Sequence, residues 1–162
     1  TRDGERTGSL YYAPPELQIT NLHGDGITEK TDVYLLAKTL WSFINNGIRP
    51  FSGQYNRDNE YMALVAKTYC VSTVEPLNEL LYKSTFDFEK SRIDLGYFKA
   101  LIKEQIEVCE GSATKERLQQ YSISEQIYNL KTRSRPSSEI YEKYKKEAKE
   151  LENVFFAGHS GG

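Results

Sequence analysis

The stretch TDVYLLAKTLWSFINN, residues 31–46, decides the fold. Its apolar residues recur at helical spacing, and further apolar residues fill the flanks. This set comprises Val33, Tyr34, Leu35, Leu36, Ala37, Leu40, Trp41, Phe43 and Ile44. Because apolar side chains nearly encircle the helix axis, we expect a buried helix. Thr28 or Thr31 can cap its start, and Gly47 can supply a left-handed residue after its end.

Three further helices are expected downstream. Asp58 can cap the first helix. Ser72 and Glu75 stand at capping-box spacing before the second. Asp94 can cap the third, which ends at Gly111. The expected inward-facing residues are Met62, Leu64, Val65 and Tyr69 in the first, Leu77, Leu80 and Leu81 in the second, and Phe98, Leu101, Ile102, Ile106 and Cys109 in the third. Strand signals are nearly absent, so the sequence predicts a mostly α fold.

The two ends of the chain have a different character. Residues 1–31 are rich in glycine and proline and leave room only for a short helix at 16–20. Beyond Gly111 the chain becomes more polar, and we expect a helical extension over 111–157 with a flexible tail at 158–162. Ser122 and Glu125 can form a capping box there. The last helix, about 137–153, is amphipathic and either packs back on the domain or binds a partner.

Bulk composition excludes several classes of function. The chain has 162 residues, enough for one compact domain with an appendage, and 21 basic against 23 acidic residues. This balance does not favour nucleic acid or an anionic membrane as a partner. No apolar run approaches the ~20 residues that a membrane helix needs, and no signal peptide is recognised, so we expect a cytoplasmic protein. Cys70 and Cys109 lie far apart without metal-ligand spacing, which predicts buried, reduced thiols and no metal site.

A second stretch, GSLYYAPPE at residues 8–16, resembles the end of the protein kinase activation segment. That family has Gly-Thr, two residues, Tyr, one residue and then Ala-Pro-Glu. Ser9 replaces the Thr and keeps its hydroxyl, and Pro14 replaces the Ala, while Pro15 and Glu16 match. The buried helix then resembles the central helix of the kinase C-lobe, which opens with Asp-Val-Trp/Tyr, here at Asp32.

Two later stretches follow in the order of the same family. GIRPFSG at 47–53 resembles the Gly-x-x-Pro-Phe loop after the central helix. LLYKST at 80–85, followed by Arg92, resembles the helix and loop that carry the family's late Arg, with one extra residue and Phe88 in place of Pro. The resemblance covers about residues 5–110 and implies a partial kinase C-lobe with residues 111–157 as a helical extension.

The resemblance implies roles for individual residues. Gly8, Ser9 and Tyr12 would belong to the loop that seats the protein substrate, and the hydroxyl of Ser9 is typical of Ser/Thr kinases. Glu16 and Arg92 would form an ion pair that ties the activation segment to the lower lobe. Its loss would cost about 3–5 kcal/mol if the pair is buried.

Two further assignments rest on the same resemblance. Asp32 would anchor the central helix to the catalytic loop, although an acid in the first turn of a helix is also favoured by the helix dipole alone. Thr7 is a possible regulatory phosphosite in the activation segment.

The sequence has no catalytic residues of phosphoryl transfer. It contains neither a Gly-rich nucleotide loop, nor a His-Arg-Asp catalytic loop, nor an Asp-Phe-Gly motif. We therefore expect no catalysis, cofactor or metal in this chain alone, whereas ATP and Mg²⁺ are implied for a full parent kinase. In a whole lobe, one face of the helix at 31–46 would pack on upstream elements. We expect it to bind the N-terminal part of the kinase domain or to self-associate.

Two alternatives stay open. The parent can be a pseudokinase or scaffold that keeps the lobe for protein interactions, because the discriminating residues lie upstream of residue 1. More remotely, GDGITEKT at 24–31 is close to the P-loop pattern GxxxxGK[ST] of NTPases. Glu29 stands where that pattern needs Gly, and its carboxylate would repel a phosphate.

Overall fold

The computed structural model describes residues 11–19, 27–132 and 145–154. Its elements are α1 (Pro15–Ile19), α2 (Glu29–Ile44), η1 (Ala66–Tyr69), α3 (Glu75–Ser84), η2 (Glu89–Ser91), α4 (Leu95–Glu110) and α5 (Lys115–Thr132), where η denotes a 3-10 helix. Residues 145–154 form one more helix. No strand occurs among the described residues, so the mostly α prediction is confirmed.

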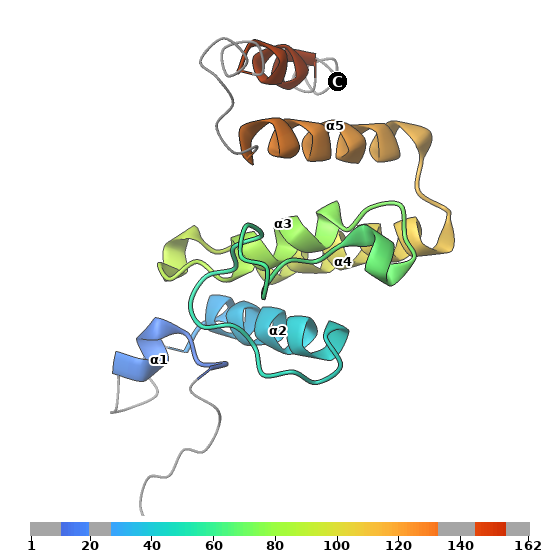
Figure 1. The fold of residues 1–162 in the computed structure, drawn as a ribbon. Coiled ribbons are helices and arrows are strands. Elements are labelled where there is room, and N and C mark those ends of the chain that lie inside the picture. Colours follow the sequence, from blue (N-terminus) through green and yellow to red (C-terminus); the bar gives the residue numbers. More distant parts are fainter. Residues whose placement is uncertain (1–10, 20–26, 133–144, 155–162) are drawn as a thin grey trace, which may run out of the picture.

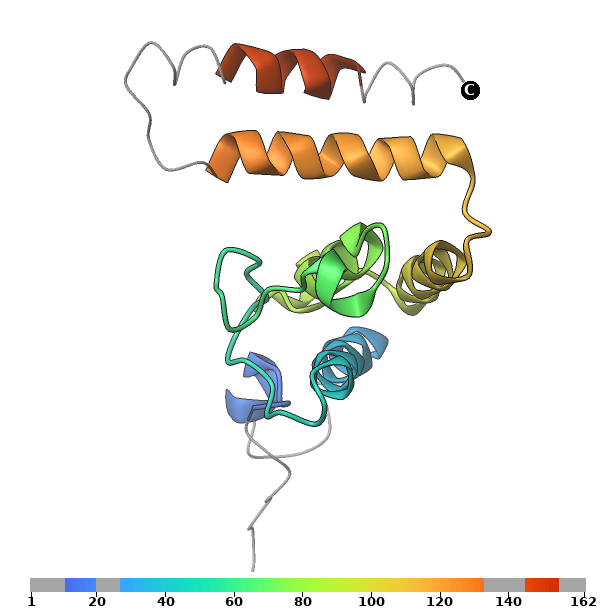
Figure 2. The same cartoon turned by 45° about the vertical axis from the view of Figure 1, so that its right-hand side comes forward.

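The helices stack in layers above α2 (Figures 1 and 2). α3 and α4 pack on each other and both contact α2, while α5 contacts α3 from the other side. The helix at 145–154 lies beyond α5, and the Nζ of Lys131 contacts the carboxylate of Glu152 between them. The order of the layers therefore follows the order of the chain.

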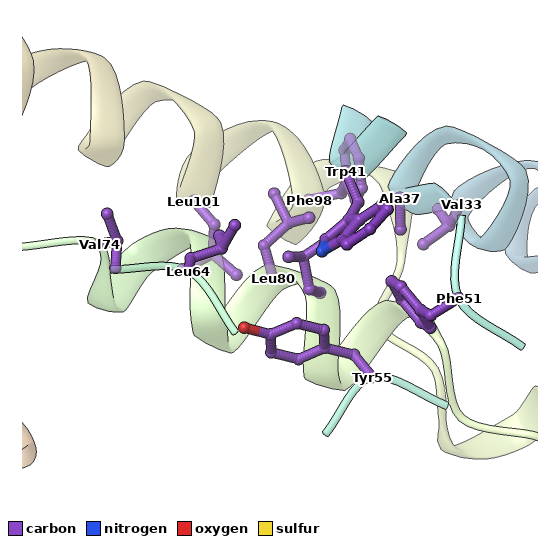
Figure 3. Close-up of a cluster of buried hydrophobic side chains, with 11 residues drawn as sticks. Val33, Ala37, Trp41, Phe51, Tyr55, Leu64, Val74, Leu80, Phe98 and Leu101 are labelled. Carbon is purple, nitrogen blue, oxygen red and sulfur yellow. The ribbon is translucent and has the colours of Figure 1, made fainter. Parts of the chain in front are cut away.

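The hydrophobic core lies where α2, α3 and α4 meet (Figure 3). It consists of Val33, Ala37, Trp41, Phe51, Tyr55, Leu64, Val74, Leu80, Leu81, Phe98 and Leu101. Trp41 is 1% exposed, its Nε1 donates to the carbonyl of Met62 at 2.9 Å, and its ring meets Phe51 edge-on at 5.4 Å. Removing a side chain of this size from a core costs about 3–5 kcal/mol. The helix predicted to be buried therefore supplies much of the core from one face, whereas Leu36 and Phe43 on its other face are exposed.

The ends of α2 follow from its capping residues. The side chain of Thr28 accepts from the backbone of Lys30, and the hydroxyl of Thr31 accepts from the backbone of Thr28. Both predicted caps therefore act together as one capping box. The helix ends at Ile44, after which Asn46 and Gly47 adopt φ of 57° and 77°. Gly47 tolerates this left-handed conformation because it lacks a Cβ.

The helix predicted to follow Asp58 is wrong. Residues 57–62 form turns, residues 63–65 are irregular, and only the short η1 follows them. The side chain of Asn56 accepts from the backbone N–H of Asp58, and that of Asn59 accepts from the backbone of Tyr61, each at 2.9 Å. Such local bonds satisfy the backbone without a helix, which is why asparagine favours turns.

Three smaller expectations also need correction. Ser72 does not cap α3, whose N-cap residue is Val74 without a side-chain cap; the Thr73 hydroxyl accepts from the backbone N–H of Glu75 at 3.1 Å instead. Residues 122 and 125 lie inside α5 and do not start a helix. Cys70 and Cys109 are exposed, not buried. Asp94 and Gly111, in contrast, cap the two ends of α4 as predicted.

Lys38 on α2 is fully buried, although nothing in the sequence indicated that this lysine lies among the apolar residues of the core. Its Nζ donates to the carbonyls of Phe51 at 2.6 Å and Gly53 at 2.5 Å, and it lies 3.7 Å from the centre of the Phe51 ring. Burial lowers the pKa of Lys38 from 10.5 to about 7, against a smaller opposing effect of Asp87. A neutral amine still has two N–H groups for the two carbonyls, so both protonation states keep these bonds.

The buried amine predicts a pH-dependent stability. Since the pKa of Lys38 is about 7 when folded and 10.5 when unfolded, the unfolded chain binds more protons between these values. The free energy of unfolding should therefore rise as the pH increases from about 7 to about 9, a range below the ordinary titration of tyrosine. Urea unfolding of wild type and Lys38→Met across this range measures the effect.

The Lys38→Met variant should lose most of that rise, because a thioether does not titrate. Lys103→Met, which removes a lysine side chain that is 79% exposed, serves as the matched control and should keep it. Equal pH slopes for wild type and Lys38→Met would contradict a depressed pKa at this position.

Candidate functional site

The structure brings Glu16 and Arg92 together although they are 76 positions apart in the sequence. Arg92 Nη1 donates to Glu16 Oε1 at 2.6 Å, and Nη2 donates to Oε2 at 2.9 Å. The Arg92 side chain is fully buried, whereas the Glu16 side chain is 19% exposed. This bidentate pair joins α1 to the segment that leads into α4.

Arg92 also holds the backbone of its surroundings. Its Nε donates to the carbonyl of Phe86 at 2.7 Å, Nη2 to that of Asp87 at 3.2 Å and Nη1 to that of Lys30 at 3.4 Å. Its Cζ lies 4.7 Å from the centre of the Tyr34 ring. The guanidinium thus links α1, the start of α2 and the loop after α3, a role that needs its planar fork of donors.

The N-terminus of α2 completes this junction. Thr31 is fully buried, and its hydroxyl donates to Glu16 Oε1 at 3.2 Å. Lys30 Nζ donates to the carbonyl of Arg92 at 2.7 Å, and Glu29 Oε1 accepts from the backbone of Leu95 at 2.7 Å. Sequence reasoning assigned no role to Lys30, and it read Glu29 only as a departure from a P-loop. Their position in the first turn of the central helix was the available signal.

The electrostatics of the junction favour an ionised Glu16. Burial alone would raise the pKa of its carboxyl, but the hydrogen bond and charge of Arg92, the backbone at Glu16 and the Thr31 hydroxyl together lower the pKa below 4.5. The carboxylate therefore stays charged to more acidic pH than a free glutamate, and it stabilises the fold as long as it does.

The other residues singled out by sequence lie apart from this pair. Tyr12 is half-buried, and its hydroxyl donates to Ser42 of α2 at 3.2 Å, so the structure engages it in a contact within the protein. Asp32 is exposed on the first turn of α2. Thr7, Gly8 and Ser9 lie outside the described residues.

One stripe of α2 points away from the described core. Leu36 is 44% exposed and Phe43 is 82% exposed, two helical turns apart on the same side. Leu40 lies between them and is partly buried, and Asp32 continues the stripe towards the N-terminus. We call Leu36, Leu40 and Phe43 the open stripe. Of the large apolar side chains among the described residues, Phe43 is the most exposed.

The remaining chemistry of the described residues is limited. No group of three or more metal-ligating side chains gathers in the described ranges, and no helix there has the length and apolar character to cross a bilayer. Of the P-loop-like stretch, only residues 27–31 are described. There Lys30 and Thr31 are engaged by the Glu16–Arg92 junction, as given above.

Comparison with protein-family models gives no match, and comparisons with curated proteins and with solved structures give no significant match either.

The junction predicts unequal costs for its two partners. Arg92→Lys should lower the free energy of unfolding by about 3–5 kcal/mol, because an ammonium cannot reach the five oxygen atoms and leaves buried acceptors unpaired. Glu16→Gln should cost less, since the amide keeps one acceptor and the site has access to water. Chemical denaturation of the three proteins measures the difference.

The pH profile separates the charge from the packing. The stability that Glu16 contributes is present above its unfolded pKa and is lost as the pH falls through its lower folded pKa. Glu16→Gln should therefore differ most from wild type near neutral pH and converge with it in acid. A constant difference at every pH would show that the charge of Glu16 is irrelevant.

Proposed function

We propose that the chain is the later part of a Ser/Thr protein kinase C-lobe, which supplies the substrate-seating loop and the lobe core to a phosphotransferase. The parent would transfer phosphate from ATP, with Mg²⁺, to protein serine or threonine. The observation that carries the proposal is the buried bidentate pair between Glu16 and Arg92. The motif resemblance named these two residues out of 23 acidic and 21 basic residues.

The position of the pair supports the same assignment. Glu16 is the last residue of the stretch that resembles the end of the activation segment. Arg92 follows the helix that resembles the one before the family's late Arg. Between them, α2 has more buried residues than any other described helix, which supports its assignment as the central helix of the family. The contact between Glu16 and Arg92 and the burial of α2 both support the proposal.

The open stripe supports the proposal that further elements of a kinase lobe pack against α2. In a whole kinase lobe the central helix packs on elements that precede the activation segment. Leu36 and Phe43 expose the surface that such elements would bury. At roughly 25 cal/mol per Å² of apolar surface, covering two large side chains contributes several kcal/mol to association. The partner of this stripe is proposed to be the N-terminal part of the kinase domain or, in its absence, a second copy of the chain.

This partner predicts self-association of the isolated chain. Sedimentation should show dimers or larger species, with binding of a dye that reports exposed apolar surface. Phe43→Glu should shift the chain to monomer by placing a charge in the contact, with little effect on stability because Phe43 is 82% exposed.

Phe88→Glu is the matched control, since Phe88 is 66% exposed but lies in the loop before η2. It should leave the association unchanged. A wild-type chain that sediments as a monomer without dye binding would refute the role of the open stripe.

The catalytic part of the proposal needs the whole parent protein. With labelled ATP and Mg²⁺ it should transfer phosphate to serine or threonine of a general protein substrate. Ser9→Ala should lower kcat/KM by about tenfold or more, because misplacement of the substrate hydroxyl slows in-line transfer. Ser112→Ala, at an exposed site after α4, is the control and should retain full activity.

The same assay separates the pseudokinase alternative. A parent that binds ATP but transfers no phosphate would defeat the active-kinase proposal and leave a scaffold role. A parent that binds no ATP and carries no kinase motifs upstream would overturn the family assignment itself.

A further inference from the structure

A cavity of about 550 Å³ lies between the loop at 54–58, α3 and α5, separate from the Glu16–Arg92 junction. Its size is in the usual range of ligand sites. The loop supplies Asp58 and Arg57, α3 supplies Glu75, Glu79 and Tyr82, and α5 supplies Tyr128. The lining thus combines carboxylates with aromatic rings.

A guanidinium already occupies part of this lining. Arg57 Nη2 donates to Glu75 Oε1 at 2.7 Å, and Nη1 donates to Oε2 at 3.2 Å. The Cζ of Arg57 lies 3.6 Å from the centre of the Tyr128 ring. Glu75 is 8% exposed, so it is a built part of the cavity wall. The protein therefore shows, within its own chain, the geometry in which this wall binds a guanidinium.

Two other carboxylates of the lining, Glu79 and Asp58, each have one oxygen atom to which no described residue donates. Glu79 uses Oε1 for both Lys83 at 2.7 Å and the Tyr97 hydroxyl at 2.5 Å, and no described residue donates to its Oε2. Asp58 accepts from the Tyr128 hydroxyl through Oδ1, which leaves Oδ2. Three carboxylates face the single cation Arg57, so the formal charge of the lining is negative. A ligand that complements it must be a donor and a cation.

The tyrosine rings of the lining indicate which kind of cation the cavity favours. Tyr82 is 49% exposed and lines the cavity together with Tyr128, whose ring already carries the Arg57 guanidinium. Such rings favour a cation on an apolar stem over a hydrated metal ion. We propose that this cavity binds a guanidinium or ammonium group on an aliphatic stem, as carried by an arginine or lysine side chain of a polypeptide partner.

A neighbouring cavity favours a polypeptide over a free small cation. It has a volume of about 260 Å³, shares Glu75 and Glu79 with the first, and continues between α3, α4 and α5 to Glu104. The shared carboxylates let an extended ligand reach both spaces, whereas one small cation fills neither. The surface therefore suits a segment with a basic residue beside apolar ones.

The test uses the full chain and the blocked peptide acetyl-Leu-Arg-Leu-amide. Titration followed by NMR should give saturable shifts of amides at 54–58 and 75–82, with affinity in the millimolar range or tighter. The same peptide with citrulline in place of arginine has the same shape without the charge and should bind at least about tenfold more weakly. n-Propylguanidinium, a free small cation, forms the second arm.

Two variants assign the binding to the cavity. Glu79→Gln should weaken the arginine peptide about tenfold, the usual effect of one charge-assisted hydrogen bond. Lys83→Gln breaks the same Lys83–Glu79 ion pair without touching the lining, and it should bind as well as wild type or better. Tyr82→Leu keeps an apolar side chain and should still weaken binding by loss of the ring face.

The outcomes are decisive in either direction. Tighter binding of the peptide than of n-propylguanidinium supports a polypeptide ligand, and equal binding supports the cation alone as the ligand. The proposal is overturned if no shift saturates, if the citrulline peptide binds equally, or if Lys83→Gln weakens binding as much as Glu79→Gln. None of these results depends on kinase activity, so they leave the proposed function untouched.

Discussion

The buried guanidinium of Arg92 constrains the rest of the structure. Its N–H groups donate to five oxygen atoms, which come from α1, the first turn of α2 and the loop after α3. A charge without access to water is tolerated only when such partners are complete. The start of α2 is therefore fixed by this cation as much as by its own capping box, and α1 is held although it has only five residues.

The helices and their ends could largely be predicted from the sequence, because they depend on local interactions. The spacing of apolar residues indicated α2 and its part in the core. The side chains of Thr28 and Asp94 and the left-handed backbone of Gly111 marked helix ends by local interactions. The contact between Glu16 and Arg92 is not local. It came from a resemblance that assigns partners by motif, since nothing in composition or periodicity couples two residues 76 positions apart.

The features that sequence reasoning missed depend on tertiary partners. In the sequence Lys38 looks like an ordinary surface lysine of a helix. In the structure the loop at 51–53 covers it and supplies two carbonyl acceptors. Arg57 stacks on Tyr128 only because α5 passes over the loop. The helix predicted after Asp58 is wrong because the apolar spacing there favoured a helix, whereas the side chains of Asn56 and Asn59 bind nearby backbone N–H groups and hold the chain in turns. In each case a side chain binds a backbone group or an aromatic ring, and the spacing of apolar residues does not predict such a contact.

The attachment of α5 differs in kind from the packing of α2, α3 and α4. Arg117 binds Glu104 at 2.8 Å, Thr73 binds Glu125 at 2.9 Å and Arg57 stacks on Tyr128, so charged and polar groups carry much of this contact. Dissolved ions weaken exposed charge pairs, with a screening length of about 8–10 Å at moderate ionic strength, but they act much less on buried pairs and leave the burial of apolar surface intact. Added salt should therefore weaken the attachment of the outer helix α5 more than it weakens the packing of α2, α3 and α4.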